Sequence, residues 1–297
     1  MLLPNKNAKF IGQGITGSEG RRSLPLMRNF GTNIVAGVTP GKGGQEVDGI
    51  PVFNSVKDAI DNVGPVDGSV QFVPPLFTKG AVFEAINAGI KFILIGAEKV
   101  PVRDSAEIYE YAKLHKANVV GPSSVGLINL ERNLKIGEIG GSDPNRVFSK
   151  GNIAVISKSG GMTSEIGLIL KNNGFGISWA VGIGGDRIIS TDFADFLLEL
   201  EKDNGTKASV IFGELGGTSE QRVAELVKEG KMIKPVVAFI AGEFTSHLPS
   251  DVQFGHAGAI IEGKRGLPSE KRKVLRDAGV AVAENFDEIP LLLRKIL

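Results

Sequence analysis

His256 is the residue whose type and surroundings best suit chemistry. It stands among small residues in the run Phe254–Ala259 and is one of three histidines in the chain. Flanking glycines leave few bulky contacts, so this imidazole could move, and imidazole is an effective nucleophile. Glu214 lies in a second glycine-containing run, Phe212–Gly217, and its carboxylate could orient the imidazole through the second ring nitrogen. The pair predicts a histidine that carries a phosphoryl group; the alternative is a histidine that only hydrogen-bonds a surface loop.

The segment Ser157–Glu165 could bind an anion. It follows a short apolar run and opens a segment of helical period, so we expect Ser159 to cap a helix. The backbone amides of Gly160 and Gly161, together with the helix dipole, would then favour negative charge. We predict a phosphate-binding site at these three residues, with a capped helix and ordinary glycine packing as the alternative.

A glycine-rich turn near the start of the chain predicts a nucleotide site. Gly12, Gly14 and Gly17 spell GxGxxG between an apolar run and a helical segment, where backbone amides can approach a phosphate. A tight turn without a ligand is the alternative. Lys42 follows the next apolar run, which ends at Val38, whereas an NAD site would need Asp or Glu there. A ligand with an extra phosphate near its ribose, coenzyme A or NADP, is therefore expected, unless Lys42 is an ordinary solvated lysine.

Prolines and an aspartate mark three further turns. Pro74 and Pro101 each follow an apolar run, where they could stiffen the walls of the same crevice or only punctuate the strands. Asp186, in the turn Gly182–Arg187, could cap a helix or bind a ligand.

The elements that would position these residues alternate between strand and helix. Short apolar runs separated by segments of helical period indicate parallel sheets with helices on both faces and ligand sites at the carboxyl ends of the strands. In the first half we expect strands and helices, respectively, at Ala8–Ile11, Asn33–Val38, Ser69–Val73 and Lys91–Ile95, and at Gly17–Asn29, Ser55–Asp61, Thr78–Ala88 and Ser105–Lys116. After the polar stretch Gly141–Gly151 we expect strands at Ile153–Ser157, Ile177–Val181, Ser209–Gly213, Val236–Ile240 and Val280–Ala283.

Composition favours a globular intracellular protein. With 42% apolar residues, the 297-residue chain can bury two ordinary cores. A net charge of +1 gives no basic footprint for nucleic acid. The chain has no cysteine, which excludes disulfides, thiolate metal sites and a cysteine nucleophile. We find no signal pattern and no apolar run of about 20 residues, so a cytoplasmic protein without membrane contact is expected.

In combination these motifs resemble the alpha subunit of succinyl-coenzyme A synthetase and the matching module of ATP-citrate lyase and citryl-coenzyme A synthetase. The likeness covers nearly the whole chain, and the motifs follow the family order at Gln13–Gly20, Val38–Gly44, Gly121–Pro122, Ser157–Gly161, Gly182–Asp186, Gly213–Gly217 and Gly255–Ala259. The resemblance implies an α/β fold. A Rossmann-like domain that binds coenzyme A would span residues 1–125, and a flavodoxin-like, doubly wound parallel-sheet domain would span residues 126–297.

The resemblance also implies roles for individual residues. His256 would be the phosphohistidine and Glu214 its orienting carboxylate, and Ser159, Gly160 and Gly161 would receive the phosphate. The residues along coenzyme A would be Gly14, Thr16, Gly17, Ser18, Glu19, Lys42, Pro74, Ile95, Gly96, Ala97 and Glu98. The coenzyme A thiol would attack an acyl phosphate made from an acid and a nucleotide, with the phosphate relayed through the histidine.

The same resemblance implies a partner. No metal ligands are expected in this chain, because ATP or GTP with Mg²⁺ would lie on a beta subunit with an ATP-grasp fold. A hetero-oligomer is therefore expected.

Departures from the family pattern bear on the acid substrate. Succinate members have Asn-Cys-Pro where this chain has residues 123–125, and a tyrosine in place of Ser164. Citrate members look closer, since they share Gly-Gly-Met at 160–162, an arginine at Arg187 and Val-Gln-Phe at 252–254. Smaller residues would leave room for a tricarboxylate, so we predict citryl-CoA synthetase ahead of succinyl-CoA synthetase. The predicted substrate residues are Ser123, Ser124, Ser164 and Arg187. Lys99 stands where the family usually has glycine.

Two other classes of function stay open. An NADP-dependent oxidoreductase would use the GxGxxG turn, and tight NADPH binding without competition from coenzyme A would support it. A non-catalytic coenzyme A-binding protein would leave His256 as a loop residue. Phosphorylation of His256 discriminates the ligase from this last class.

Overall fold

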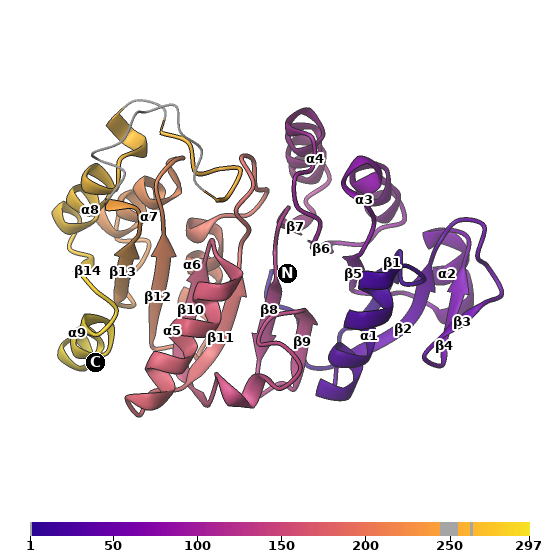
Figure 1. Ribbon diagram of the computed structural model, residues 1–297, viewed down its shortest axis with the longest axis horizontal. Coiled ribbons are helices and arrows are strands. Elements are labelled where there is room, and N and C mark those ends of the chain that lie inside the picture. The colour runs from indigo at the N-terminus through magenta and orange to yellow at the C-terminus, as the bar shows by residue number, and fades with distance from the viewer. Residues whose placement is uncertain (1, 244–254, 262–263) are drawn as a thin grey trace. The chain divides into compact units, whose positions relative to one another are not determined.

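The chain folds into two compact units. The computed structural model describes residues 2–243, 255–261 and 264–297 (Figure 1). Unit 1 comprises Met1–Ser142 with Ile188–Ser190, and unit 2 comprises Asp143–Arg187 with Thr191–Leu297. The predicted domain boundary between residues 125 and 126 stays a prediction.

Unit 1 contains a mostly parallel sheet. Its strands are β1 (Lys9–Gln13), β2 (Asn33–Val38), β3 (Glu46–Val47), β4 (Ile50–Phe53), β5 (Gly68–Gln71), β6 (Phe92–Ile95) and β7 (Asn118–Val120). They are arranged in the order β3-β4-β2-β1-β5-β6-β7. All neighbours pair in parallel except β3 and β4. The carboxyl ends of β2, β1, β5 and β6 therefore follow one another along one edge of the sheet.

Three helices of unit 1 form one layer on this sheet. The helices of the unit are α1 (Ser18–Phe30), α2 (Val56–Val63), α3 (Thr78–Asn87) and α4 (Val102–Leu114), with a 3-10 turn η1 (Pro75–Phe77) before α3. The Val56 amide of α2 donates to Glu84 of α3 at 2.7 Å, and Phe83 of α3 stacks on Tyr111 of α4 with ring centroids 4.0 Å apart. Buried apolar side chains of the sheet and of these helices form a core that includes Ile11, Val38, Val82, Ile93, Ile95 and Ile108.

Helix α1 packs instead against an antiparallel hairpin of β8 (Gly126–Asn129) and β9 (Leu134–Gly137). At the end of α1, the Thr32 hydroxyl donates to the carbonyl of Lys135 at 2.5 Å, and the Lys135 amide lies 3.0 Å from the same hydroxyl oxygen. Gly31, with φ 119°, terminates α1, because this left-handed conformation suits glycine.

Unit 2 contains a parallel sheet whose strands are buried. The strands are β10 (Lys150–Ser157), β11 (Ile177–Gly182), β12 (Ala208–Gly213), β13 (Val236–Ile240) and β14 (Ala281–Ala283). The pairings run β14-β13-β12-β10-β11, all in parallel. Every residue of β11 and β12 is buried, which is typical of parallel sheets covered on both faces.

Helices of unit 2 form two layers. They are α5 (Gly160–Asn172), α6 (Phe193–Lys202), α7 (Ser219–Lys228), α8 (Pro268–Asp277) and α9 (Glu288–Ile296), with 3-10 turns η2 (Pro144–Arg146) and η4 (Lys264–Gly266). Arg294 of α9 donates to the carbonyl of Asn173 at the end of α5 at 2.7 Å. Arg222 of α7 pairs with Asp192 and Asp195 at the start of α6. These contacts place α5 with α9, and α6 with α7.

The predicted α/β fold with two parallel-dominated sheets is confirmed, and each expected strand and helix is present with its ends shifted by at most a few residues. The hairpins β3–β4 and β8–β9 and the short strand β7 were not predicted. Each of these five strands contains only two to four residues, so none gives an extended apolar run in the sequence. Within the described ranges, no helix combines the length and apolarity needed to cross a bilayer.

Candidate functional site

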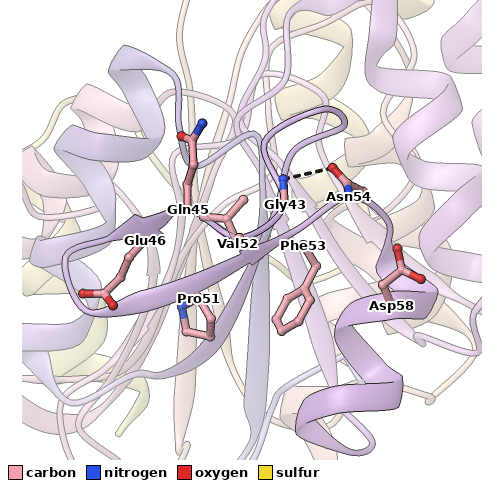
Figure 2. A pocket seen from close by; sticks show the side chains of 9 residues that line it. Gly43, Gln45, Glu46, Pro51, Val52, Phe53, Asn54 and Asp58 are labelled. Atoms are coloured by element: carbon pink, nitrogen blue, oxygen red, sulfur yellow. Dashed lines mark hydrogen bonds between the residues drawn. The ribbon is translucent and has the colours of Figure 1, made fainter.

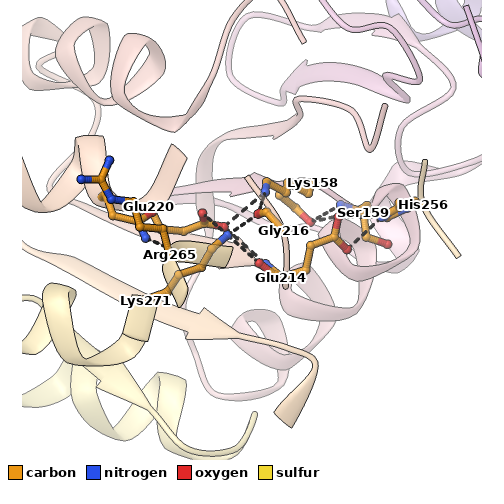
Figure 3. A network of polar contacts seen from close by, with 10 residues as sticks. Lys158, Ser159, Glu214, Gly216, Glu220, His256, Arg265 and Lys271 are labelled. Atoms are coloured by element: carbon orange, nitrogen blue, oxygen red, sulfur yellow. Dashed lines mark hydrogen bonds and ion pairs between the residues drawn. The ribbon is translucent and has the colours of Figure 1, made fainter. Parts of the chain in front are cut away.

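His256 and Glu214 form a hydrogen-bonded pair (Figure 3). The imidazole Nδ1 lies 3.0 Å from Oε1 and 2.9 Å from Oε2 of Glu214. The side chain of Glu214 is 13% exposed and that of His256 is 32% exposed. A carboxylate can only accept, so Nδ1 is the donor in this contact, and a neutral ring bonded in this way has its lone pair on Nε2. The structure thus brings together the two residues that the sequence paired, with a partly exposed imidazole.

The sheet of unit 2 brings the surrounding turns to one edge. Ser157, the last residue of β10, is in register with Gly182 of β11 and Phe212 of β12. The turn after β10 carries Ser159, and the turn after β12 carries Glu214. Parallel strands in register end together, so the amino end of α5 and the carboxylate that holds His256 lie at the same edge.

Glycines let the segment around His256 approach two of these turns closely. A Cβ on Gly185 would come within 2.5 Å of the imidazole Cγ, and a Cβ on Gly258 within 2.8 Å of the carbonyl oxygen of Asp186. Gly216 is held at φ 81° directly against the carbonyl of Gly258. The amide of Gly258 donates to the carbonyl of Gly185 at 2.9 Å. Close backbone approach is therefore one physical reason for glycine here, besides the mobility that the sequence suggested.

The amino end of α5 offers backbone amides to an anion. Ser159 is the N-cap, as predicted, but its Oγ lies 3.5 Å from the Met162 amide, at the long limit for a hydrogen bond. Its carbonyl accepts from the Thr163 hydroxyl at 2.8 Å. Around Gly161, an added Cβ would meet no described atom within 4 Å. The first-turn amides beginning at Gly160 and the helix dipole can therefore receive negative charge.

Asp186 does not cap a helix in the described part of the chain, so that alternative is wrong. Helix α6 begins at Phe193, and its N-cap is Asp192, which accepts from the Ala194 amide at 2.9 Å. Asp192 also forms a capping box with Asp195. Asp186 lies instead in the irregular segment that follows β11.

A buried ionic network lies beneath the turn that carries Glu214 (Figure 3). Glu220 and Lys271 are fully buried with Nζ 2.6 Å from Oε2, and the Nζ of Lys158 lies 3.4 Å from Oε1 of Glu220. Lys271 donates to the carbonyl of Glu214 at 2.8 Å and also to that of Gly216. The Glu214 amide donates to Glu220 at 3.4 Å. The network therefore holds Glu214 by both its backbone amide and its carbonyl.

The ionisation of Glu220 and of Lys271 depends on burial and on the charges of the other members of the network. Burial disfavours the ionised carboxyl of Glu220, but the charges of Lys158 and Lys271 outweigh burial and keep the pKa of Glu220 below its usual value. Burial lowers the pKa of Lys271 to about 8, against the attraction of Glu220. Removing one member would leave a buried charge without its main partner, which is strongly destabilising.

This network was not among the predicted sites, although the sequence contains a signal for it. Glu220 stands three and four residues before the buried Val223 and Ala224 on α7, and Lys271 stands four residues before the buried Leu275 on α8. A charged residue on the apolar stripe of a helix is unusual and indicates a buried partner.

Unit 1 contains a cavity of about 1140 Å³ at the carboxyl ends of its central strands. Apolar side chains supply much of its wall, among them Val38, Val73 and Phe77. The predicted coenzyme A residues that line it are Gly14, Thr16, Gly17, Ser18, Glu19, Pro74, Gly96, Ala97 and Glu98. Lys42 lies outside this lining on an exposed loop after β2, and the Ile95 side chain is fully buried in the core.

The amino end of α1 opens into this cavity. Its N-cap is Gly17, and within this described segment no side chain caps the helix. Gly14 has φ 82°, and a Cβ there would lie 2.9 Å from the carbonyl oxygen of Phe72. The first-turn amides of α1 are therefore presented without a competing side chain, as a phosphate group requires.

The predicted substrate residues fall in both units. Ser123 and Ser124 line the cavity of unit 1, and the Ser124 hydroxyl oxygen accepts from the Gly126 amide at 3.0 Å. In unit 2, Ser164 lies on α5 and Arg187 is exposed on the turn after β11.

Two departures from the family pattern share a backbone conformation. Lys99 has φ 58° and Ser123 has φ 61°. Glycine and asparagine adopt this left-handed region most readily, so the glycine that the family usually has at 99 and the asparagine of succinate members at 123 suit the same backbone.

A second hollow of about 440 Å³ lies beside the loop that carries Lys42 (Figure 2). Its lining includes Gln45, Glu46, Asn54 and Asp58, and the Gly43 amide donates to Asn54 Oδ1 at 2.9 Å. Two carboxylates in this lining make it unsuited to a phosphate.

The described residues contain no cluster of three or more His, Asp or Glu side chains placed to hold a metal. Residues 252–254, which carried part of the likeness to citrate-using members, lie outside the described residues.

Comparisons with known proteins agree with this arrangement. A CoA binding domain matches residues 5–99, and a CoA-ligase domain matches residues 156–284. The chain is 42% identical over 296 residues to the succinate–CoA ligase (ADP-forming) subunit alpha 1 of Archaeoglobus fulgidus, covering 100% of this chain and 98% of that protein. It is also 42% identical over 298 residues to an ADP-forming sulfoacetate-CoA ligase subunit from an Acholeplasma species, covering 99% and 98%.

One solved structure is similar along nearly the whole chain. It is the ATP citrate lyase of Methanothrix soehngenii in complex with citrate and coenzyme A, with a TM-score of 0.90 and 28% identity. The match covers 99% of this chain and 50% of that one, so this chain spans half the length of that ATP citrate lyase chain.

Proposed function

The chain belongs to the family of alpha subunits of ADP-forming acid–CoA ligases, and from this premise we propose that His256 carries the phosphoryl group between a nucleotide and a carboxylic acid. The observation that carries the proposal is the contact of Glu214 with Nδ1 of His256 at 2.9 Å. This contact supports the tautomer in which Nε2 would be the nucleophile. The family assignment also removes the basis for an NADP-dependent oxidoreductase.

The proposed reaction has three steps. The Nε2 lone pair attacks the terminal phosphorus of the nucleotide, so that an N–P bond forms while the P–O bond to the departing ADP breaks. A carboxylate oxygen of the acid then takes the phosphoryl group, with O–P formation and N–P cleavage, which gives an acyl phosphate. The coenzyme A sulfur attacks the acyl carbon, the C–O bond breaks, and phosphate leaves as the thiol proton is released. Glu214 stabilises the positive charge that phosphorylation places on the ring.

Coenzyme A fits the cavity of unit 1. The uncapped amino end of α1 suits its diphosphate, and the apolar walls suit the methyl and methylene groups of its pantetheine arm. We propose that Lys42, on the loop after β2, contacts the 3′-phosphate on the ribose. The amino end of α5 would receive the phosphate of His256, at Ser159, Gly160 and Gly161.

A partner subunit completes the proposal. An ATP-grasp beta subunit would hold ATP or GTP with Mg²⁺ in a cytoplasmic hetero-oligomer, as the family resemblance implies.

Citrate is the acid that we propose to test first. The support is the likeness to citrate-using members, position by position: small side chains at Ser123, Ser124 and Ser164, and an arginine at Arg187. Succinate and sulfoacetate are the second candidates, because relatives with 42% identity are named for these acids.

The test is an acid panel. The chain is co-purified with its partner, and release of phosphate is measured with ATP or GTP, coenzyme A and one of citrate, succinate, sulfoacetate or malate. We expect phosphate release that requires both coenzyme A and one acid. Release that is independent of coenzyme A would contradict the ligase, and preference for succinate or sulfoacetate would reject only the citrate proposal.

A further inference from the structure

Gln71 is a buried polar side chain whose hydrogen bonds are incomplete. It is the last residue of β5, it is 1% exposed, and it lines the cavity of unit 1. Among the described residues, its Oε1 has no hydrogen-bond partner. A buried amide oxygen without a partner is costly, so such an atom on a residue that lines a ligand-sized cavity points to a donor supplied by the ligand.

A chain of hydrogen bonds determines which atom of the Gln71 side-chain amide has no hydrogen-bond partner among the described residues. The Gln13 Nε2 donates to the carbonyl of Ala81 at 3.0 Å, so its Oε1 must be the acceptor on the other side. That oxygen accepts from the Ser69 hydroxyl at 2.6 Å and from Gln71 Nε2 at 3.1 Å. A rotated Gln71 amide would set two oxygens against each other. Gln71 Oε1 is therefore an acceptor that no group of the described residues uses, on a residue that lines the cavity.

The order of the strands indicates which part of a ligand passes Gln71. Lys42 follows β2, the phosphate-binding turn follows β1, and Gln71 ends the next strand, β5. Gln71 is in register with Gln13 of β1 on one side and with Ile95 of β6 on the other. If the 3′-phosphate lies at Lys42 and the diphosphate at α1, the remainder of coenzyme A continues across β5 towards β6.

We propose that Gln71 Oε1 accepts a hydrogen bond from an amide N–H of the pantetheine arm of coenzyme A. The inference rests on the proposed binding of coenzyme A and adds a residue that recognises the arm. A neutral acceptor repels phosphate and carboxylate oxygens but matches a secondary amide, of which the arm has two. The apolar side chains of Val73 and Phe77 in the same wall suit the groups on either side of an amide.

Gln71→Met tests the proposal, because it keeps the length of the side chain and removes the acceptor. Binding of coenzyme A and of adenosine 3′,5′-bisphosphate, which lacks the arm, is measured by calorimetry on the full chain. We expect coenzyme A to bind about tenfold more weakly to the variant and adenosine 3′,5′-bisphosphate to bind unchanged. Retained bisphosphate binding also shows that the variant is folded. Gln71→Asn, whose amide is one methylene shorter, should lose coenzyme A affinity in the same way.

Ser69→Ala is the matched control. It removes the other hydrogen bond to Gln13 Oε1, and Ser69 does not line the cavity. We expect coenzyme A affinity within twofold of the unchanged chain. Equal losses for the two ligands in Gln71→Met, or an unchanged affinity for coenzyme A, would overturn the role of Gln71. Absence of coenzyme A binding to the unchanged chain would instead reject the proposed function.

Discussion

Replacing Glu214 by glutamine separates the orientation of His256 from the fold around it. The carboxylate contacts the imidazole with both oxygens, whereas the buried network holds only the backbone of Glu214. Glutamine has the same shape and leaves those backbone contacts in place. Its amide group can also donate to Nδ1, which would stabilise the tautomer whose Nε2 carries a proton and cannot attack phosphorus.

The size of the effect follows from the lost contact. A hydrogen bond that involves a charged group contributes about 1.5–3 kcal/mol. Because each 1.36 kcal/mol is tenfold in rate, phosphorylation of His256 should slow by about 10- to 150-fold. The free energy of unfolding should change by less than about 1 kcal/mol, since glutamine keeps the volume and the backbone hydrogen bonds.

Rapid-quench labelling with ATP, on the complex with its partner, measures the rate of phosphorylation, and urea titration measures stability. Glu225→Gln makes the same chemical change at an exposed position of α7 and should leave both quantities unchanged. Phosphorylation of the Glu214→Gln variant within twofold of normal would refute the orienting role.

Three further changes test other parts of the account. Lys42→Ala should weaken coenzyme A by about tenfold and dephospho-coenzyme A very little, as for one lost contact with a charged group, and equal losses would reject the 3′-phosphate contact. Lys271→Met should lower the free energy of unfolding at pH 7 by about 3–5 kcal/mol, since Glu220 loses its closest partner. The pKa of Lys271 is lowered from 10.5 to about 8 in the folded chain, so between these two pH values the unfolded chain binds more protons than the folded chain. Lys271 therefore makes the free energy of unfolding rise with pH between about pH 8 and 10.5. Urea titrations at several pH values should show a smaller rise in the variant. Gly185→Ala places a Cβ against the imidazole of His256 and should slow its phosphorylation. The free energy of unfolding should fall by no more than about 1–3 kcal/mol. A normal rate of phosphorylation would contradict the close packing.

Much of the fold could be predicted because its elements are long and their periods are distinct. The apolar run Ile177–Val181 predicts a buried strand from local sequence alone. The turn at Ser157–Gly161 likewise predicts the start of a capped helix. The pairing of Glu214 with His256 came from residue type and glycine context, and the structure brings the two side chains together.

The elements that were missed depend on contacts between distant residues. The two short hairpins depend on tertiary contacts, such as the hydrogen bond from the Lys135 amide to the Thr32 hydroxyl oxygen. A strand of two to four residues is too short to show a hydrophobic period in the sequence. The burial of Glu220 with Lys271 requires α7 to pack against α8, a contact that local sequence does not predict. The incomplete hydrogen bonding of Gln71 becomes visible only when Gln13 and Ala81 are located.

The most direct test of the central claim is the attachment of phosphate to His256. The complex of this chain with its nucleotide-binding partner is incubated with labelled ATP, and the chain is analysed by mass spectrometry. We predict one acid-labile, base-stable phosphate on His256, discharged when acid and coenzyme A are added together, and none in His256→Asn. Label that persists in His256→Asn, or turnover by that variant at the normal rate, would contradict the account.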